Sequence, residues 1–117
     1  MAAGLAPRPE GDGRWTCTLE TPGRRVPVYA RRTPNWLVLE TGSLAAPPGA
    51  ERRAALHRGL LHANRDLSLA RFALTETGQP VLRAELPTGN LQPAEVVAAV
   101  EALRKGIACL DALDGST

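Results

Sequence analysis

The chain of 117 residues is long enough for one domain with a buried aliphatic core, and only four of its side chains are aromatic. Its 14 basic and 12 acidic residues leave a formal net charge of +2 and are interleaved along the sequence, which argues against a dedicated nucleic-acid-binding face. No apolar run reaches the length of a membrane span or a signal peptide, so we expect no membrane association.

Residues 1–13 are rich in Gly, Pro and Ala without periodicity, which predicts a flexible N-terminal segment. Regular structure is expected to begin at Arg14 and to form a single domain over residues 14–117. Alternation of apolar and polar side chains predicts two strands, over residues 15–21 and 26–30, and the run at residues 36–40 predicts a third strand that is apolar on both faces. Their short turns imply an antiparallel meander. Pro27 suggests either an edge position or an irregular start for the second strand, because proline cannot donate a ladder hydrogen bond.

The periodicity becomes helical after Pro48, and Leu56, Leu60 and Ala63 fall on one stripe of a short helix that is expected to end at Asn64. Residues 70–75 and 81–86 alternate again and predict a hairpin. From Pro93 onward, apolar residues recur at spacings of four and three, which predicts a helix of about 20 residues. The order β-β-β-α-β-β-α is α+β, with a five-stranded antiparallel sheet packed with two helices.

The residue types needed for catalysis or metal binding are not grouped in this sequence. His57 and His62 are five positions apart, or about 140° around a helix, so the two rings do not share a face. Cys109 lies in an apolar stretch and is expected to pack as a small hydrophobe. We therefore expect no catalytic residue, no metal and no cofactor. Two distant cysteines without a CxxC motif fit the reducing cytoplasm.

Residues 60–103 carry a family resemblance. Leu60, Leu61 and Asn64 end a helix, the strand Arg-Phe-Ala-Leu follows at residues 71–74, and a second strand covers residues 81–87 before the long helix. With the three strands upstream, this pattern resembles the YbjN-like proteins over residues 14–113. That bacterial family is described as sensory transduction regulators and is grouped with the type III secretion chaperone-like fold.

The resemblance implies a fold of order α-β-β-β-α-β-β-α that usually dimerises and binds other proteins through apolar surface patches, without cofactor or catalysis. Two features of this chain differ from the family pattern. Residues 1–13 have no helical pattern, so the usual first helix has no counterpart in them. The sequence pI of about 8.9 is basic, whereas secretion chaperones are usually acidic.

The resulting hypothesis is a non-enzymatic, cytoplasmic, homodimeric module that acts as a chaperone or regulator by holding an apolar segment of a partner protein. Trp36, Leu37 and Leu39 are the candidate partner-binding residues, because their strand is apolar on both faces. For the dimer interface, the resemblance favours the first predicted helix, with Leu56, Leu60 and Ala63, and the long helix is the competing surface. The alternative is a single-stranded nucleic-acid-binding module that uses surface arginines.

Overall fold

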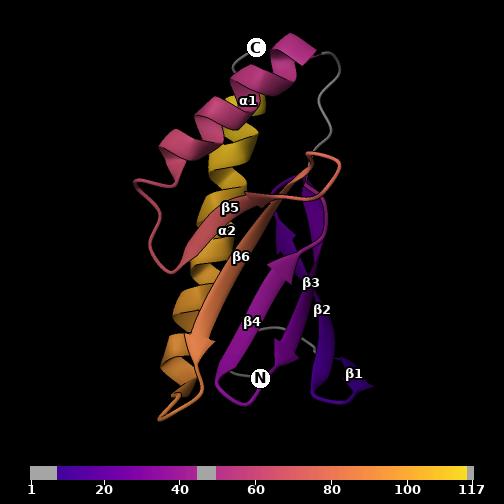
Figure 1. The fold of residues 1–117 in the computed structure, drawn as a ribbon, viewed down its shortest axis with the longest axis vertical. Coiled ribbons are helices and arrows are strands. Elements are labelled where there is room, and N and C mark those ends of the chain that lie inside the picture. Colours follow the sequence, from indigo (N-terminus) through magenta and orange to yellow (C-terminus); the bar gives the residue numbers. More distant parts are fainter. Residues whose placement is uncertain (1–7, 45–49, 116–117) are drawn as a thin grey trace.

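The computed structural model describes residues 8–44 and 50–115 as an antiparallel sheet and two helices (Figure 1). The strand order is β1-β2-β3-β4-β6-β5. The strands are β1 (Arg8–Gly11), β2 (Arg14–Thr21), β3 (Arg24–Arg32), β4 (Trp36–Thr41), β5 (Ala70–Leu74) and β6 (Pro80–Pro87). The helices are α1 (Ala50–Ala63) and α2 (Pro93–Gly115). The predicted α+β class is confirmed, but the sheet has six strands, so the predicted number of five is wrong.

The sixth strand is β1, which lies inside the segment predicted to be flexible. It pairs antiparallel with β2. The turn between the two strands is built from Gly11, Asp12 and Gly13, all of which have positive φ, a region that glycine enters without steric cost. The four residues of β1 carry no apolar alternation, so periodicity could not reveal the strand. The prediction that regular structure begins at Arg14 is wrong, and residues 1–7 lie outside the described residues.

Pro27 lies in β3, which is an interior strand, so its predicted edge position is also wrong. The pairing of β3 with β4 begins at Val28 opposite Thr41, one residue beyond the proline. The carbonyl of Pro27 accepts a hydrogen bond of 3.0 Å from the amide of Gly42. The amide and carbonyl of one strand residue point to the same side, so the missing N–H of Pro27 faces Gly42, where β4 has ended. No ladder bond is lost.

β4 pairs directly with β6, although α1 and β5 lie between them in the sequence. β5 then adds to the outside of β6 and forms one edge of the sheet. Asn64 follows the last residue of α1, where the sequence predicts the helix end. Its side-chain Oδ1 accepts a hydrogen bond of 2.7 Å from the amide of Phe72, and its Nδ2 donates one of 3.2 Å to the carbonyl of Phe72.

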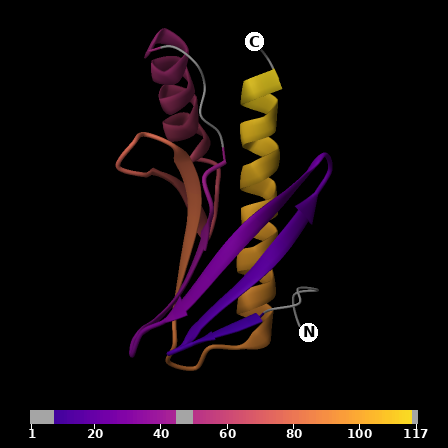
Figure 2. The ribbon, with the colours of Figure 1, turned by 90° about the vertical axis from the view of Figure 1, so that its right-hand side faces the viewer.

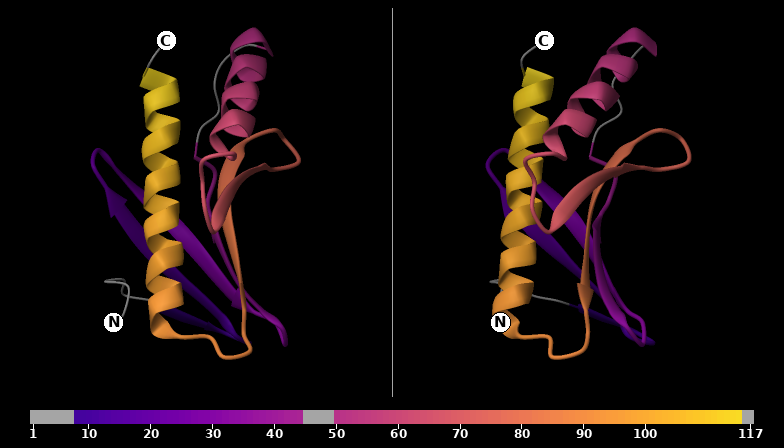
Figure 3. Two further views of the ribbon diagram at one scale, coloured as in Figure 1. Left: turned by 90° about the vertical axis from the view of Figure 1, so that its left-hand side faces the viewer. Right: turned by 60° about the vertical axis from the view of Figure 1, so that its left-hand side comes forward.

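α2 packs along one face of the sheet, and the β2–β3 hairpin crosses beside it because the sheet is strongly twisted (Figure 2). Gly106 of α2 is the point of closest approach, since a Cβ atom there would lie 2.6 Å from a methyl carbon of Leu82. α1 lies beside the C-terminal half of α2 (Figure 3), with Gly59 against the side chain of Leu113. Buried side chains shared by β2, β3, β4, β5, β6 and both helices form one core: Leu19, Val26, Val28, Leu39, Leu56, Leu60, Phe72, Leu82, Leu86, Val100, Leu103, Ile107 and Leu110.

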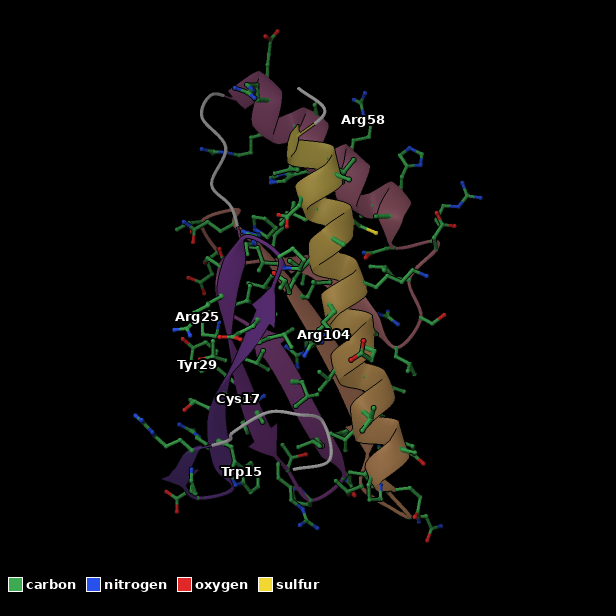
Figure 4. The ribbon with its side chains drawn as sticks, turned by 180° about the vertical axis from the view of Figure 1, so that it is seen from behind. Trp15, Cys17, Arg25, Tyr29, Arg58 and Arg104 are labelled. Carbon is green, nitrogen blue, oxygen red and sulfur yellow. The ribbon has the colours of Figure 1, made fainter. Side chains whose placement is uncertain are left out.

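Two arginines tie the β2–β3 hairpin to the rest of the chain. The guanidinium of Arg24 donates hydrogen bonds of 2.9 and 3.2 Å to the carbonyl of Leu44 and lies 3.4 Å from a carboxylate oxygen of Asp111 in α2. Arg104 of α2, labelled in Figure 4, donates a hydrogen bond of 2.9 Å to the carbonyl of Glu20. In the part of the chain that the structure describes, no helix has the length and apolar character needed to span a membrane.

Candidate functional site

The face of the sheet turned away from α2 is not covered by either helix of the described residues (Figures 1 and 2). We call it the open face. Alternation along the strands and the pairing register place one row of side chains across it, from β2 to β5: Thr16, Tyr29, Glu40, Arg83 and Arg71. A neighbouring row holds Arg14, Arg31, Val38 and Glu85. The open face therefore combines charged side chains with a few apolar ones.

Two shallow hollows lie on the open face and share Arg83. The larger, of about 690 Å³, is lined by residues of β2, β3, β4 and β6: Arg14, Trp15, Thr16, Tyr29, Ala30, Arg31, Val38, Glu40 and Arg83. The smaller, of about 290 Å³, lies toward the β5 edge and is lined by Trp36, Leu69, Arg71, Arg83 and Glu85. Together the two hollows are lined by residues of β2, β3, β4, β6 and β5.

The predicted partner-binding residues do not share one face. Trp36 lies on the open face with 44% of its surface exposed. Leu39 is buried in the core under α2, and Leu37 packs partly buried against the same core. The strand is apolar on both faces, as expected, but only Trp36 of the three predicted residues is directed to the open face. Sequence reasoning missed Tyr29, which is 51% exposed and lies on the neighbouring strand.

The two acidic side chains of these two rows, Glu40 and Glu85, both contact one arginine. Arg83 lies 3.3 Å from Glu40 through Nη1 and 3.3 Å from Glu85 through Nε. The first contact also has hydrogen-bond geometry, whereas Nε of Arg83 has no hydrogen-bond partner, so the pair with Glu40 is the better-formed contact. All three groups are partly exposed, and each pair contributes little to stability.

With this geometry established, the sequence and the fold can be compared with known proteins. The YbjN family, described as "Putative bacterial sensory transduction regulator", matches residues 1–107. The chain belongs to the YbjN family. No curated protein matches the sequence. The family predicted from residues 60–103 is therefore confirmed.

This YbjN-family chain is similar in structure to a chain of the heterodimeric ExoU–SpcU complex from the type III secretion system of Pseudomonas aeruginosa. The TM-score is 0.67 at 21% sequence identity, and the match covers 94% of this chain and 89% of that chain. The predicted type III secretion chaperone-like fold is confirmed by this likeness. Residues 8–44 contain no helix, and the segment before β1, where the usual first helix would stand, lies outside the described residues.

The three side chains of α1 that were predicted to form a dimer interface face the core of the chain itself. Leu56 and Leu60 of α1 are buried in the core, and Ala63 packs against it partly buried. Leu61, on another side of the same helix, is 70% exposed. A second copy would therefore meet Leu61 rather than Leu56 and Leu60.

The histidines and cysteines of this YbjN-family chain lie apart from the open face. Nε2 of His57 donates a hydrogen bond of 3.0 Å to the carbonyl of Gly78, which ties α1 to the β5–β6 turn. His62 is exposed. Among the described residues there is no group of three or more potential metal ligands. Cys17 and Cys109 are free thiols, and burial raises the pKa of the Cys17 thiol.

Proposed function

We propose that this YbjN-family chain is a non-enzymatic protein-binding module, chaperone-like or regulatory, that holds a segment of a partner protein on the open face. The observation that carries this proposal is the open face itself, which has two exposed aromatic side chains beside two connected hollows. Exposed aromatic residues are typical anchors of protein interfaces, because they contribute large contact areas at a small entropy cost. The likeness to a chain of a heterodimeric secretion-system complex is consistent with a protein partner.

Apolar side chains of the partner are expected to contact Trp36 and Tyr29. Truncation of an aromatic anchor at the centre of an interface commonly costs more than 2 kcal/mol of binding free energy. Affinity capture from the native bacterium with the wild-type chain, followed by calorimetry on the purified partner, tests this directly. Trp36→Ala should weaken binding by roughly thirtyfold, which corresponds to about 2 kcal/mol.

Leu74→Ala is the matched control for that experiment. Leu74 is 48% exposed, almost the same fraction as Trp36, but it lies at the end of β5 and shares with Phe72 the face of the sheet opposite to the open face. The control should bind the partner like the wild-type chain. If Trp36→Ala binds with unchanged affinity, the open face is not the binding surface and the proposal fails.

The proposal includes a homodimer formed through the exposed side of α1. Leu61 supports this part, since a side chain of that size that is 70% exposed on a helix can be buried by a second copy. Light scattering at concentrations of about tens of micromolar should give the mass of a dimer for the wild-type chain. Leu61→Glu should give the mass of a monomer, and Leu74→Glu should remain dimeric. A wild-type monomer at these concentrations would exclude the dimer.

Single-stranded nucleic acid is the second candidate partner. Arginine and exposed aromatic side chains occur together on the open face, and this combination binds unstacked bases in other proteins. A filter-binding titration with single-stranded DNA and RNA should then show an affinity that falls steeply with salt. No retention of either strand at low salt excludes this candidate.

A further inference from the structure

The pairing register brings arginines into two like-charged pairs on the open face. Arg14 of β2 lies directly opposite Arg31 of β3, and Arg71 of β5 lies directly opposite Arg83 of β6. Like charges directly opposite each other on neighbouring strands destabilise a sheet. The fold therefore carries two unfavourable pairs on one face, one in each hollow.

The acidic residues of the open face do not relieve this repulsion fully. Glu40 and Glu85 both contact Arg83. Arg14, Arg31 and Arg71 are exposed and form no ion pair with any side chain in residues 8–44 and 50–115 that the structure describes. Within the two rows, four arginines face two carboxylates, which leaves the rows positive by two charges.

We propose that the two arginine pairs bind acidic side chains of an extended segment of the partner protein. This inference rests on the proposed function and names the chemistry of its partner. One carboxylate would lie between Arg14 and Arg31, and a second would lie beside Arg71 at the β5 edge. A guanidinium pair matches a carboxylate well, because each guanidinium presents several N–H donors in one plane.

The spacing of the pairs sets the spacing of the acidic residues in the partner. The two pairs are three strands apart across the sheet and two residues apart along it. With about 4.8 Å between strands and about 3.3 Å per residue, their centres are separated by roughly 16 Å. Side chains of an extended segment alternate between two faces, so two acids that both face the sheet are an even number of residues apart, and a spacing of four residues, about 13 Å, comes nearest to this distance.

The surface between the two arginine pairs determines which partner residues can lie between the two acidic residues. Val38 is 6% exposed and forms the floor, and Trp36 and Tyr29 are exposed on either side of it. Glu40 also lies between the pairs and repels a further negative charge. A peptide with apolar residues between two acids satisfies all of these groups. A nucleic acid fits less well, because it carries a phosphate at every nucleotide and places one near Glu40.

Labelled synthetic peptides test this inference on the full chain. Each has about ten residues, with valine, leucine and threonine around two glutamates that are either about four or about two positions apart. A third peptide has lysines in place of the glutamates. Anisotropy titrations should show tightest binding for the wider spacing, at least about fivefold weaker binding for the narrow spacing, and no binding for the lysine peptide.

Arg31→Gln and Arg71→Gln each remove one arginine from a pair, and Arg58→Gln removes an exposed arginine from α1 as the matched control (Figure 4). The first two variants should bind the wide-spaced peptide at least about fivefold more weakly than the wild-type chain does, and the control should bind it with wild-type affinity. The Arg31→Gln and Arg71→Gln variants should also unfold at the same urea concentration as the wild-type chain or at a higher one, because each lacks one repulsive arginine pair. This second measurement separates loss of binding from loss of folding.

Three results would overturn the inference. The first is failure of the wide-spaced peptide to bind at about 0.5 mM. The second is binding of this peptide by the Arg31→Gln and Arg71→Gln variants with the same affinity as by the wild-type chain. The third is binding of single-stranded RNA by a chain that does not bind the peptide. The purified natural partner distinguishes the two levels of the proposal. If it loses affinity for Trp36→Ala but not for the arginine variants, the proposed function stands and the acidic-segment inference fails.

Discussion

The side-chain amide of Asn64 forms two hydrogen bonds with the backbone of Phe72, one to its amide and one to its carbonyl. A neighbouring strand would make the same two bonds, so Asn64 takes the place of a seventh strand at this position of β5. The contact also joins the end of α1 to the sheet edge. Unpaired edge groups are a template for pairing with other chains, and this residue occupies one such pair.

Asn64→Ala is expected to lower the free energy of unfolding by about 1–3 kcal/mol, because two backbone groups at a partly buried position lose their partner. Urea titration followed by circular dichroism measures this change. Asn35→Ala is the control, since Asn35 is exposed and its side chain forms no hydrogen bond with the described residues. Equal midpoints for the two variants would contradict the assignment.

Gly106→Ala tests the close contact between α2 and the sheet. Alanine gains up to about 1 kcal/mol in helix propensity, but its Cβ would overlap the methyl carbons of the fully buried Leu82. Overpacking of this kind costs about 1–3 kcal/mol, so the net effect should be a lower melting temperature. Leu82→Val in the same chain should recover part of the loss. Gly89→Ala, where the added carbon meets nothing within 4 Å, should leave melting nearly unchanged.

Arg24 and Arg25 are adjacent in β3 and offer a matched comparison. Arg24 donates two hydrogen bonds to the carbonyl of Leu44, whereas Arg25 forms a solvent-exposed pair with Glu20 at 2.8 Å. Arg24→Met should cost about 1–2 kcal/mol, because the carbonyl of a buried residue loses its donor. Arg25→Met should cost less than about 1 kcal/mol. Chemical denaturation measures both losses of unfolding free energy. A larger loss for Arg25→Met than for Arg24→Met would contradict this prediction.

Cys17 makes the stability of the chain depend on pH in the alkaline range. Burial disfavours the thiolate and raises the pKa of the Cys17 thiol above its unfolded value. Its contribution to stability is therefore complete below the unfolded pKa of about 8.5 and is lost as the pH rises through the folded pKa. Unfolding free energies at a series of alkaline pH values should fall more steeply for the wild-type chain than for Cys17→Ala. Parallel curves would contradict the sign of the shift.

Much of this fold could be predicted because its strands and helices carry regular apolar periodicity. The strand predicted over residues 36–40 is β4, and the long helix predicted from Pro93 is α2. β1 could not be predicted in this way, because its side chains bury little and its pairing depends on a turn of three positive-φ residues. The position of Pro27 required knowledge of where β4 ends.

The candidate site was predicted less well than the fold. The apolar character of β4 indicates Trp36, which is exposed on the open face, but periodicity alone does not say which face α2 covers, so the prediction of a surface position for Leu39 is wrong. The two arginine pairs depend on strand register and on the insertion of β6 beside β4. Arg71 and Arg14 are far apart in the sequence, and interleaved charges conceal their common face.

The direct pairing of β4 with β6 has a consequence for local unfolding. The chain leaves the sheet after β4, forms α1 and β5, and returns to pair beside the strand that it left. The ladder formed by β2, β3, β4 and β6 can therefore persist while α1 and β5 detach together as one cooperative unit. Amide hydrogens of α1 and β5 should exchange with deuterium at a shared rate, faster than those of β3 and β4.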